Sequence, residues 1–156
     1  MDAVDAETNT LVEREIFIAA KPETVWQLLV DPRQMIRWMG LTAVLDPRPG
    51  GTYRVEVIPG RIASGQVVEI AAPRRLVHTW GWEQEGTSVP PGSTTVTFEL
   101  LPHDDGTLVR FTHSDLPHAA AAASHAQGWQ HYLERLSMLA GGSDPGADSW
   151  ITGPTQ

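Results

Sequence analysis

Three neighbouring residues, His113, Ser114 and Asp115, carry the side-chain types of a hydrolase triad. In such triads the nucleophile, the base and the orienting acid come from distant segments that meet in space. Neighbours along a strand point in different directions, so we expect this run to be the end of a strand followed by a turn or a helix cap. No catalytic residue is assigned to it.

A second group of histidines lies further along the chain. His118 and His125 are seven residues apart and share one helical face, whereas His131 falls on another face. With His113 or Asp115 they would offer ligands for zinc, which takes three or four convergent nitrogen, sulfur or oxygen atoms. Histidines near a helix end are more often solvated or satisfied within a core. We therefore expect no metal and no cofactor.

His78 and His113 each fall on a strand face that otherwise carries large apolar residues. A histidine in that position needs a hydrogen-bond partner. Water or a backbone group can fill this role. Alternatively, one or both rings point into a cavity, where they orient a ligand or act as general acid and base. Both interpretations stay open at this point.

Tryptophans come from five sequence-distant places, at Trp26, Trp38, Trp80, Trp82 and Trp129. An indole ring buries a large apolar area, yet its N–H group still needs a partner. Indoles that converge from helix and sheet suit either a bulky core or the wall of a half-polar pocket. Trp38, at the end of a short helix, and Trp129, on a long one, are the stronger pocket candidates.

The composition narrows the class of protein. The 156 residues, 41% hydrophobic and 19% charged, are typical of one globular domain. A net charge of −8 argues against binding to nucleic acid, which requires clustered Lys and Arg. The absence of cysteine excludes disulfides and thiolate metal sites. With neither an apolar signal sequence nor a run of roughly 20 apolar residues, we expect a cytoplasmic protein without membrane insertion.

The first half of the chain predicts a strand, two short helices and then more strands. Residues 11–19 alternate as a strand does. Proline just inside the first turn, after Lys21 and again after Asp31, predicts two helices, the second of which runs to Gly40. About six strands follow up to residue 113.

Turns rich in glycine, proline and aspartate separate these strands. Either Gly60 or Gly65 is expected to end one strand, and residues 83–93 form a long hairpin loop. The segment from His103 to Gly106 has the residue types of a hairpin turn. Short strands at this spacing predict an antiparallel meander.

The last predicted element is a long helix from about residue 118 to 140. Its apolar stripe consists of Trp129, Tyr132, Leu133, Leu136 and Ala140, with His125 one turn earlier on the same face. Gly128 costs about 1 kcal/mol in a helix interior, so we expect the sheet or a ligand to approach it closely. Residues 1–10 and 141–156 are expected to be flexible tails.

These elements permit few folds. An antiparallel sheet with one apolar face needs a cover, and the C-terminal helix is available for that role. We predict an α+β helix-grip fold over residues 11–140, in which a curved antiparallel sheet wraps around a long C-terminal helix and two short helices follow the first strand.

The order and spacing of several segments resemble the activator of heat-shock-protein-90 ATPase-like family of the START-like (SRPBCC) superfamily. The segments are IFIAAKPETVWQLLVDPRQMIRWMG, PGGTYRV, GQVVEIAAPRRLVHTW, TTVTFELLPHDDGTLVRFTHSDLP and GWQHYLERL. The resemblance covers about residues 11–140. It implies the helix-grip fold with a cavity between the sheet and the last helix. Nothing corresponds to the additional N-terminal domain of the co-chaperone, so chaperone activity is not carried over.

The function predicted is binding of a small hydrophobic or amphipathic ligand in that cavity, without covalent chemistry. The predicted ligand-binding residues are Met35, Trp38, His78, Trp80, Phe98, Phe111, His113, His125, Trp129 and Tyr132. One alternative is a cyclase, aromatase or hydratase that uses a cavity histidine. Another is a protein-interaction module with a filled core. A homodimer is compatible with the sequence.

Overall fold

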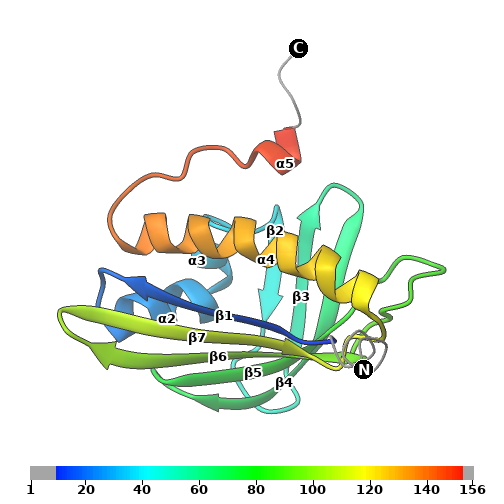
Figure 1. The fold of residues 1–156 in the computed structure, drawn as a ribbon, viewed down its shortest axis with the longest axis horizontal. Helices are drawn as coiled ribbons and strands as arrows, with labels where there is room; N and C mark the ends of the chain where they lie inside the picture. Colours follow the sequence, from blue (N-terminus) through cyan, green and yellow to red (C-terminus); the bar gives the residue numbers. More distant parts are fainter. Residues whose placement is uncertain (1–9, 153–156) are drawn as a thin grey trace, which may run out of the picture.

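The computed structural model describes residues 10–152, which form one curved sheet and four helices (Figure 1). The strands are β1 (Val12–Ile18), β2 (Thr42–Leu45), β3 (Thr52–Ile58), β4 (Arg61–Ala71), β5 (Arg75–Trp80), β6 (Thr94–His103) and β7 (Gly106–Ser114). The helices are α2 (Pro22–Val30), α3 (Pro32–Met35), α4 (Ala119–Ala140) and α5 (Ser149–Thr152).

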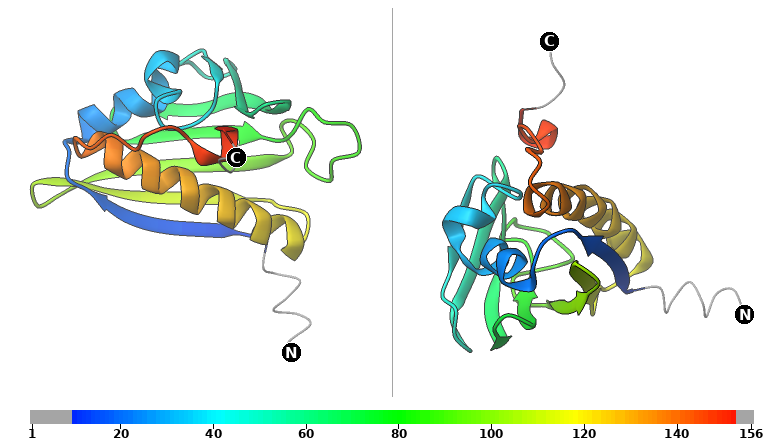
Figure 2. Two further views of the ribbon diagram at one scale, coloured as in Figure 1. Left: turned by 90° about the horizontal axis from the view of Figure 1, so that it is seen from above. Right: turned by 90° about the vertical axis from the view of Figure 1, so that its left-hand side faces the viewer.

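All seven strands pair antiparallel, in the order β1-β7-β6-β5-β4-β3-β2. From β2 to β7 each strand pairs with the next one in sequence, whereas β1 joins the far edge beside β7. The short helices α2 and α3 therefore connect strands at opposite edges of the sheet. Figure 2 shows the sheet bent around α4, which lies across its concave side. The predicted helix-grip fold is confirmed.

Alternating side chains explain why the concave face holds the core. Along β6 every second residue from Thr94 to Leu100 is buried, and β3 buries Tyr53, Val55 and Val57 in the same way. From α4 the apolar stripe contributes Trp129, whose ring centroid lies 4.5 Å from that of Phe111. Packing of the helix against the sheet removes both apolar surfaces from water, which is the main stabilising term of such a fold.

The second short helix ends earlier than the sequence predicts. The pattern predicts helix up to Gly40, but α3 ends at Met35. The amides of Arg37 and Trp38 instead donate to carbonyls three residues back, at 3.1 Å each, as in a tighter turn. In this conformation Trp38 is 2% exposed, and its Nε1 donates to the carbonyl of Leu28 at 2.8 Å.

The structure decides between the two expected strand ends, Gly60 and Gly65, and moves a second strand boundary. Gly65 lies inside β4, so the turn at Gly60 separates β3 from β4. At the other boundary β5 ends at Trp80. Trp82 continues only as an isolated bridge to Ala63, and the amide of Glu83 still donates to the carbonyl of Ile62 in β4.

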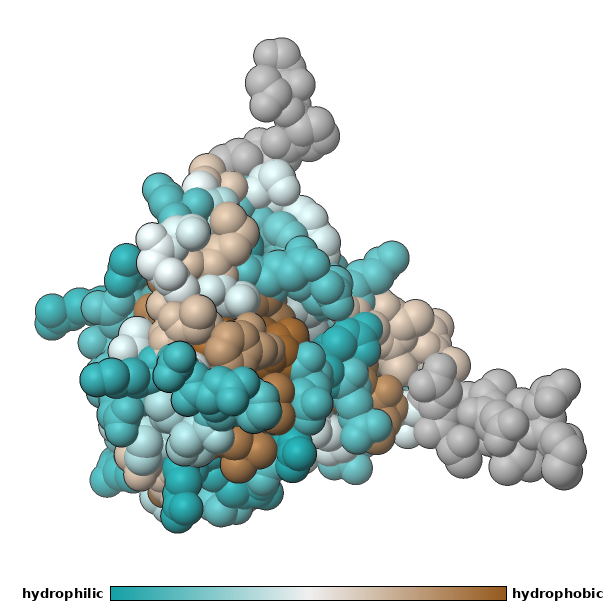
Figure 3. Space-filling view, turned by 60° about the vertical axis from the view of Figure 1, so that its left-hand side comes forward, coloured by the Kyte–Doolittle hydropathy of each residue, from teal (hydrophilic) through white to brown (hydrophobic). Residues whose placement is uncertain are grey.

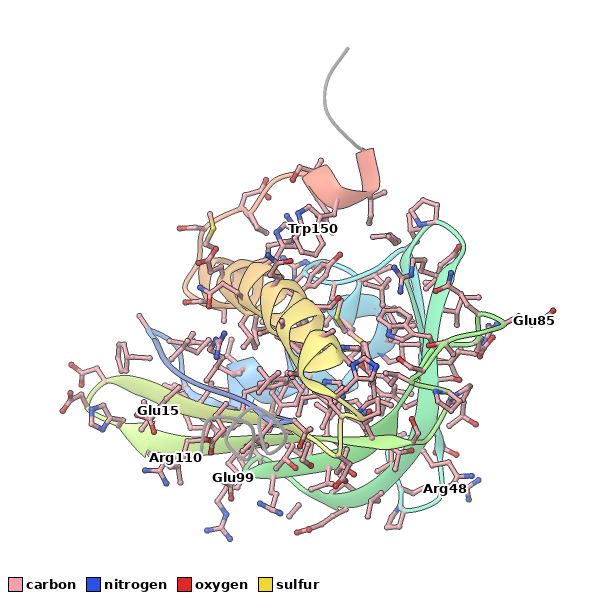
Figure 4. All side chains as sticks on the ribbon, turned by 45° about the vertical axis from the view of Figure 1, so that its right-hand side comes forward. Glu15, Arg48, Glu85, Glu99, Arg110 and Trp150 are labelled. Atoms are coloured by element: carbon pink, nitrogen blue, oxygen red, sulfur yellow. The ribbon has the colours of Figure 1, made fainter. Side chains whose placement is uncertain are left out.

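The convex face of the sheet is polar and carries ion pairs between neighbouring strands. Arg110 binds Glu15 at 2.9 Å, and Arg75 binds Glu99 at 2.7 Å. Figure 4 shows Glu15, Arg110 and Glu99 on the side of the sheet away from α4. This face is solvated, which leaves the concave side as the place for an apolar site.

The segment after α4 differs from the flexible tail expected for residues 141–156. As far as residue 152 it runs back along α4 and ends in α5 (Figure 1). Asp148 accepts hydrogen bonds from Tyr132 at 2.8 Å and from His131 at 2.7 Å. Trp150 stacks on the His131 ring, with centroids 4.0 Å apart. Residues 153–156, and 1–9 of the expected N-terminal tail, lie outside the described residues.

The end of the molecule that carries α2 and the C-terminal turns of α4 is mostly hydrophilic. Figure 3 shows hydrophobic side chains there in an area near the middle of the view and in smaller areas toward its right-hand side. No described helix is long and apolar enough to cross a membrane.

Candidate functional site

A pocket of about 340 Å³ opens at the end of the molecule where α4 begins. Three regions of the sheet side meet α4 there: the end of β3, the start of β4 and the loop 81–93. Trp150 of α5 borders the pocket from the other side (Figure 4). The pocket thus lies between the sheet and the N-terminal half of α4.

The floor of the pocket is apolar, whereas its rim is polar. Val57, Trp80, Val89 and Trp129 line the floor and are at most 6% exposed. Around the rim lie Arg61, Thr87, Ser88, His118 and Ser124. An apolar floor with a few polar groups at its edge is the usual composition of a small-molecule site.

Glycine at position 81 allows the loop 81–93 to form one wall. A Cβ atom at Gly81 would lie 1.7 Å from the carbonyl oxygen of Pro90, so any larger residue would force the two segments apart. Next to this contact the amide of Trp82 donates to the carbonyl of Val89 at 2.7 Å. The loop therefore folds back on itself and presents Val89 to the pocket.

Gly128 leaves a gap in the helical wall. It lies on the face of α4 that also carries His125, Trp129 and Tyr132, all of which line the pocket. A Cβ atom at this position would meet no atom within 4 Å. The expected close approach of the sheet is therefore absent among the described residues, and the missing side chain leaves open space.

Both ring nitrogens of His125 are engaged at the pocket wall. Nδ1 donates to the carbonyl of Ala121 at 2.8 Å, and Nε2 accepts from Nε1 of Trp82 at 3.0 Å. The tautomer follows because an indole N–H can only donate and a carbonyl can only accept. Burial lowers the pKa of His125, and the nearby charge of Arg61 lowers it further. His125 is therefore a neutral structural group.

His113 lies deeper, in a buried hydrogen-bond chain. Trp129 Nε1 donates to His113 Nδ1 at 3.0 Å, and His113 Nε2 donates to the hydroxyl of Thr94 at 2.8 Å. That hydroxyl donates to the carbonyl of Trp80 at 2.7 Å. Burial, with smaller contributions from His125 and His78, lowers the pKa of His113 to about 2.

His78 is buried away from the pocket. Its ring stacks on Tyr53 with centroids 3.7 Å apart, and Nδ1 donates to the carbonyl of Thr79 at 2.9 Å. Burial lowers its pKa to about 4. Nε2 has no hydrogen-bond partner among the described residues and no exposed surface. His78 therefore remains neutral and out of reach of a molecule in the pocket.

The structure divides the ten predicted ligand-binding residues into two groups. Four line the pocket: Trp80, His125, Trp129 and Tyr132. The other six are buried in the core and do not line it: Met35, Trp38, His78, Phe98, Phe111 and His113. Strand and helix periodicity places a residue on the inward face, but it cannot tell the filled part of the interior from the open part.

Sequence reasoning missed several lining residues. Val57 belongs to an apolar strand face, Val89 lies in the predicted hairpin loop 83–93, and the sequence gives no signal for Arg61. Trp82 is one of the five tryptophans that suit a core or a pocket wall, but it is not among the predicted ligand-binding residues. The one available signal was Gly128, whose cost in a helix interior indicated a special environment.

The side chains of residues 113–115 and of the helix histidines are not arranged as a hydrolase triad or a zinc site requires. Ser114 contacts the carbonyl of Thr95, and Asp115 accepts from the Thr95 hydroxyl, so neither side chain meets His113. Among residues 10–152 no three His, Asp or Glu side chains are grouped closely enough to hold a metal ion. The residues thus form no triad, and the considered zinc ligands do not converge.

Comparisons with known proteins identify related chains. The family model for activator of Hsp90 ATPase homolog 1-like proteins matches residues 19–141. The solution structure of an AHSA1-like protein from Rhizobium etli is 43% identical, with 94% of this chain and 91% of that chain covered and a TM-score of 0.72. No curated protein sequence matches the chain.

More distant structures share the fold. A Chromobacterium violaceum protein is 22% identical over 85% of this chain and 97% of that chain, with a TM-score of 0.75. An HSP90 activator from Plasmodium falciparum is 21% identical over 85% and 96%, with a TM-score of 0.71. The family match and the Rhizobium etli protein carry the assignment. The chain belongs to the family of activator of Hsp90 ATPase homolog 1-like proteins, within the START-like (SRPBCC) superfamily.

Proposed function

We propose that the chain binds a small hydrophobic or amphipathic molecule in the pocket beside Gly128 and performs no covalent chemistry on it. The observation that carries this proposal is the open space on the inward face of α4, where a Cβ atom at Gly128 would touch nothing. A volume of about 340 Å³ lies within the range of about 300–1,000 Å³ that is usual for ligand pockets.

The histidines support binding rather than proton transfer. A general acid or base needs a ring nitrogen that can reach the substrate and a pKa near the working pH. His125 and His113 use both ring nitrogens within the protein. His113, with a pKa of about 2, would also release its bound proton too readily to cycle near neutral pH.

The proposal is tested by filling the gap. We expect 1-anilinonaphthalene, a neutral apolar fluorophore, to quench tryptophan emission saturably in the unmodified protein. Gly128→Leu places an isobutyl group in the open space, and forcing extra methylenes into space that is already filled, here by the ligand, costs about 1–3 kcal/mol. The Kd should therefore rise about tenfold or more.

Ala123→Leu is the matched control, because Ala123 is exposed on the same helix and the variant adds a leucine without entering the pocket. It should bind the fluorophore as the unmodified protein does. Equal binding by all three proteins, or no saturable binding at all, would refute a ligand site at Gly128.

A further inference from the structure

The rim of the pocket has an unbalanced positive charge. Arg61, exposed at the first position of β4, is the one Lys or Arg among the described residues that line the pocket, and no Asp or Glu lines it. The whole chain carries a net charge of −8. The rim of the pocket therefore carries a positive charge, whereas the chain as a whole is negative.

Arg61 is held in place without an acidic partner. Its guanidinium carbon lies 4.7 Å from the centroid of the Trp82 ring, and none of the ion pairs among the described residues involves it. In contrast, Arg54, Arg75 and Arg110 each bind a carboxylate. No hydrogen bond or ion pair among the described residues engages the side-chain N–H groups of Arg61, so they stay available for an oxyanion while the guanidinium carbon lies over the Trp82 ring.

The Trp82 ring that lies next to Arg61 is held in place by the rest of the protein. Trp82 is fixed by its hydrogen bond to His125, which is itself bonded to the backbone of α4. The first turn of α4 also borders the pocket through Ala120 and Ala121. The positive end of the helix dipole therefore lies at the same rim as Arg61 and favours the same sign of ligand charge.

We propose that the ligand is an anionic amphiphile, with a carboxylate or similar oxyanion bound to Arg61 at the rim and an apolar body on Trp80 and Trp129. This inference rests on the proposed function and assigns the ligand class. The guanidinium edge can pair with such a group through two parallel N–H···O bonds, which favours an oxyanion over a neutral polar head.

Two ligand pairs test the charge separately from the apolar body. The first pair is 8-anilinonaphthalene-1-sulfonate and 1-anilinonaphthalene, which differ by one sulfonate. The second pair is decanoate and decanol, measured by displacement of the neutral fluorophore. In the unmodified protein the anion of each pair should bind more tightly.

Arg61→Gln should raise the Kd of the two anions by about 3- to 10-fold, the range expected for a partly exposed charged pair. The Kd values of the neutral partners should stay unchanged. Arg61→Lys should retain part of the preference. Arg74→Gln removes the same charge beyond the other end of β4 and should alter neither pair.

The outcomes separate this inference from the proposed function. If the neutral compounds bind but Arg61→Gln weakens both members of a pair equally, or neither, the ligand class is wrong and the pocket stands. If Gly128→Leu also leaves the neutral compounds bound, the proposed pocket fails. If neither member of either pair binds the unmodified protein, both proposals fail.

Discussion

Single residues decide whether the interior of this protein can do acid–base chemistry. His113 accepts one hydrogen bond from Trp129 and donates another to Thr94, so a second ring proton would meet an N–H group instead of an acceptor. His78 is also fully buried. Both histidines are therefore held neutral, and His113 links the buried Trp129 N–H of the helix to the Thr94 hydroxyl of the sheet.

This neutrality predicts how stability depends on pH. The pKa values of His113 and His78 in the folded state, about 2 and about 4, lie below the value of about 6.5 expected in the unfolded chain. Below pH 6.5 the unfolded state therefore binds protons that the folded state does not. The free energy of unfolding should fall by up to about 1.4 kcal/mol per pH unit for each histidine.

Urea denaturation between pH 7.5 and pH 5 measures this slope above the range where most carboxylates titrate. His113→Asn should reduce the slope by about one proton, and His103→Asn, which changes an exposed histidine, is the control. A slope that is the same in all three proteins would contradict the assignment of His113 as a buried neutral group.

Among the elements, the C-terminal segment departs most from what the sequence predicts. Residues 143–152 are rich in glycine, aspartate and proline, which indicates a loop, and nothing in their pattern reveals a partner. Their placement depends on Asp148, which accepts from Tyr132, His131 and the amide of Trp150. Burial opposes the charge of this carboxylate, but these hydrogen bonds outweigh burial and lower its pKa. Trp150 thereby borders the pocket.

We predict that Asp148→Asn loosens this segment while the sheet and α4 stay folded. The amide keeps the volume of the carboxylate but loses charge-assisted hydrogen bonds, which contribute about 1.5–3 kcal/mol each. Backbone hydrogen exchange around Trp150 should accelerate about tenfold or more, with protection in β6 unchanged. Asp144→Asn, at an exposed position of the same segment, is the control. Unchanged exchange in Asp148→Asn would show that other contacts hold the segment.

At the scale of the whole molecule, the sequence predicts which layers of the fold pack together. It does not predict where the pocket between the sheet and α4 lies. Alternation along β3 and β6 and the stripe on α4 specify which faces meet, because burial follows the period of each element. The filled and open parts depend on contacts between distant residues. Trp38 joins the core because the carbonyl of Leu28 accepts from its ring nitrogen. The loop 81–93 forms the pocket wall because Gly81 has no side chain, which lets the carbonyl of Pro90 pack against its backbone.

The position of a bound molecule tests the account most directly. Two-dimensional ¹H–¹⁵N NMR resolves the indole N–H signals, which single Trp→Phe variants assign, and 1-anilinonaphthalene is added stepwise. We predict saturable shifts of Trp82 and Trp129, which line the pocket, and unchanged signals of Trp26 and Trp38, which are buried and do not line it. Shifts confined to Trp26 and Trp38, or no saturable shift of Trp82 and Trp129, would contradict a ligand site between α4 and the loop 81–93.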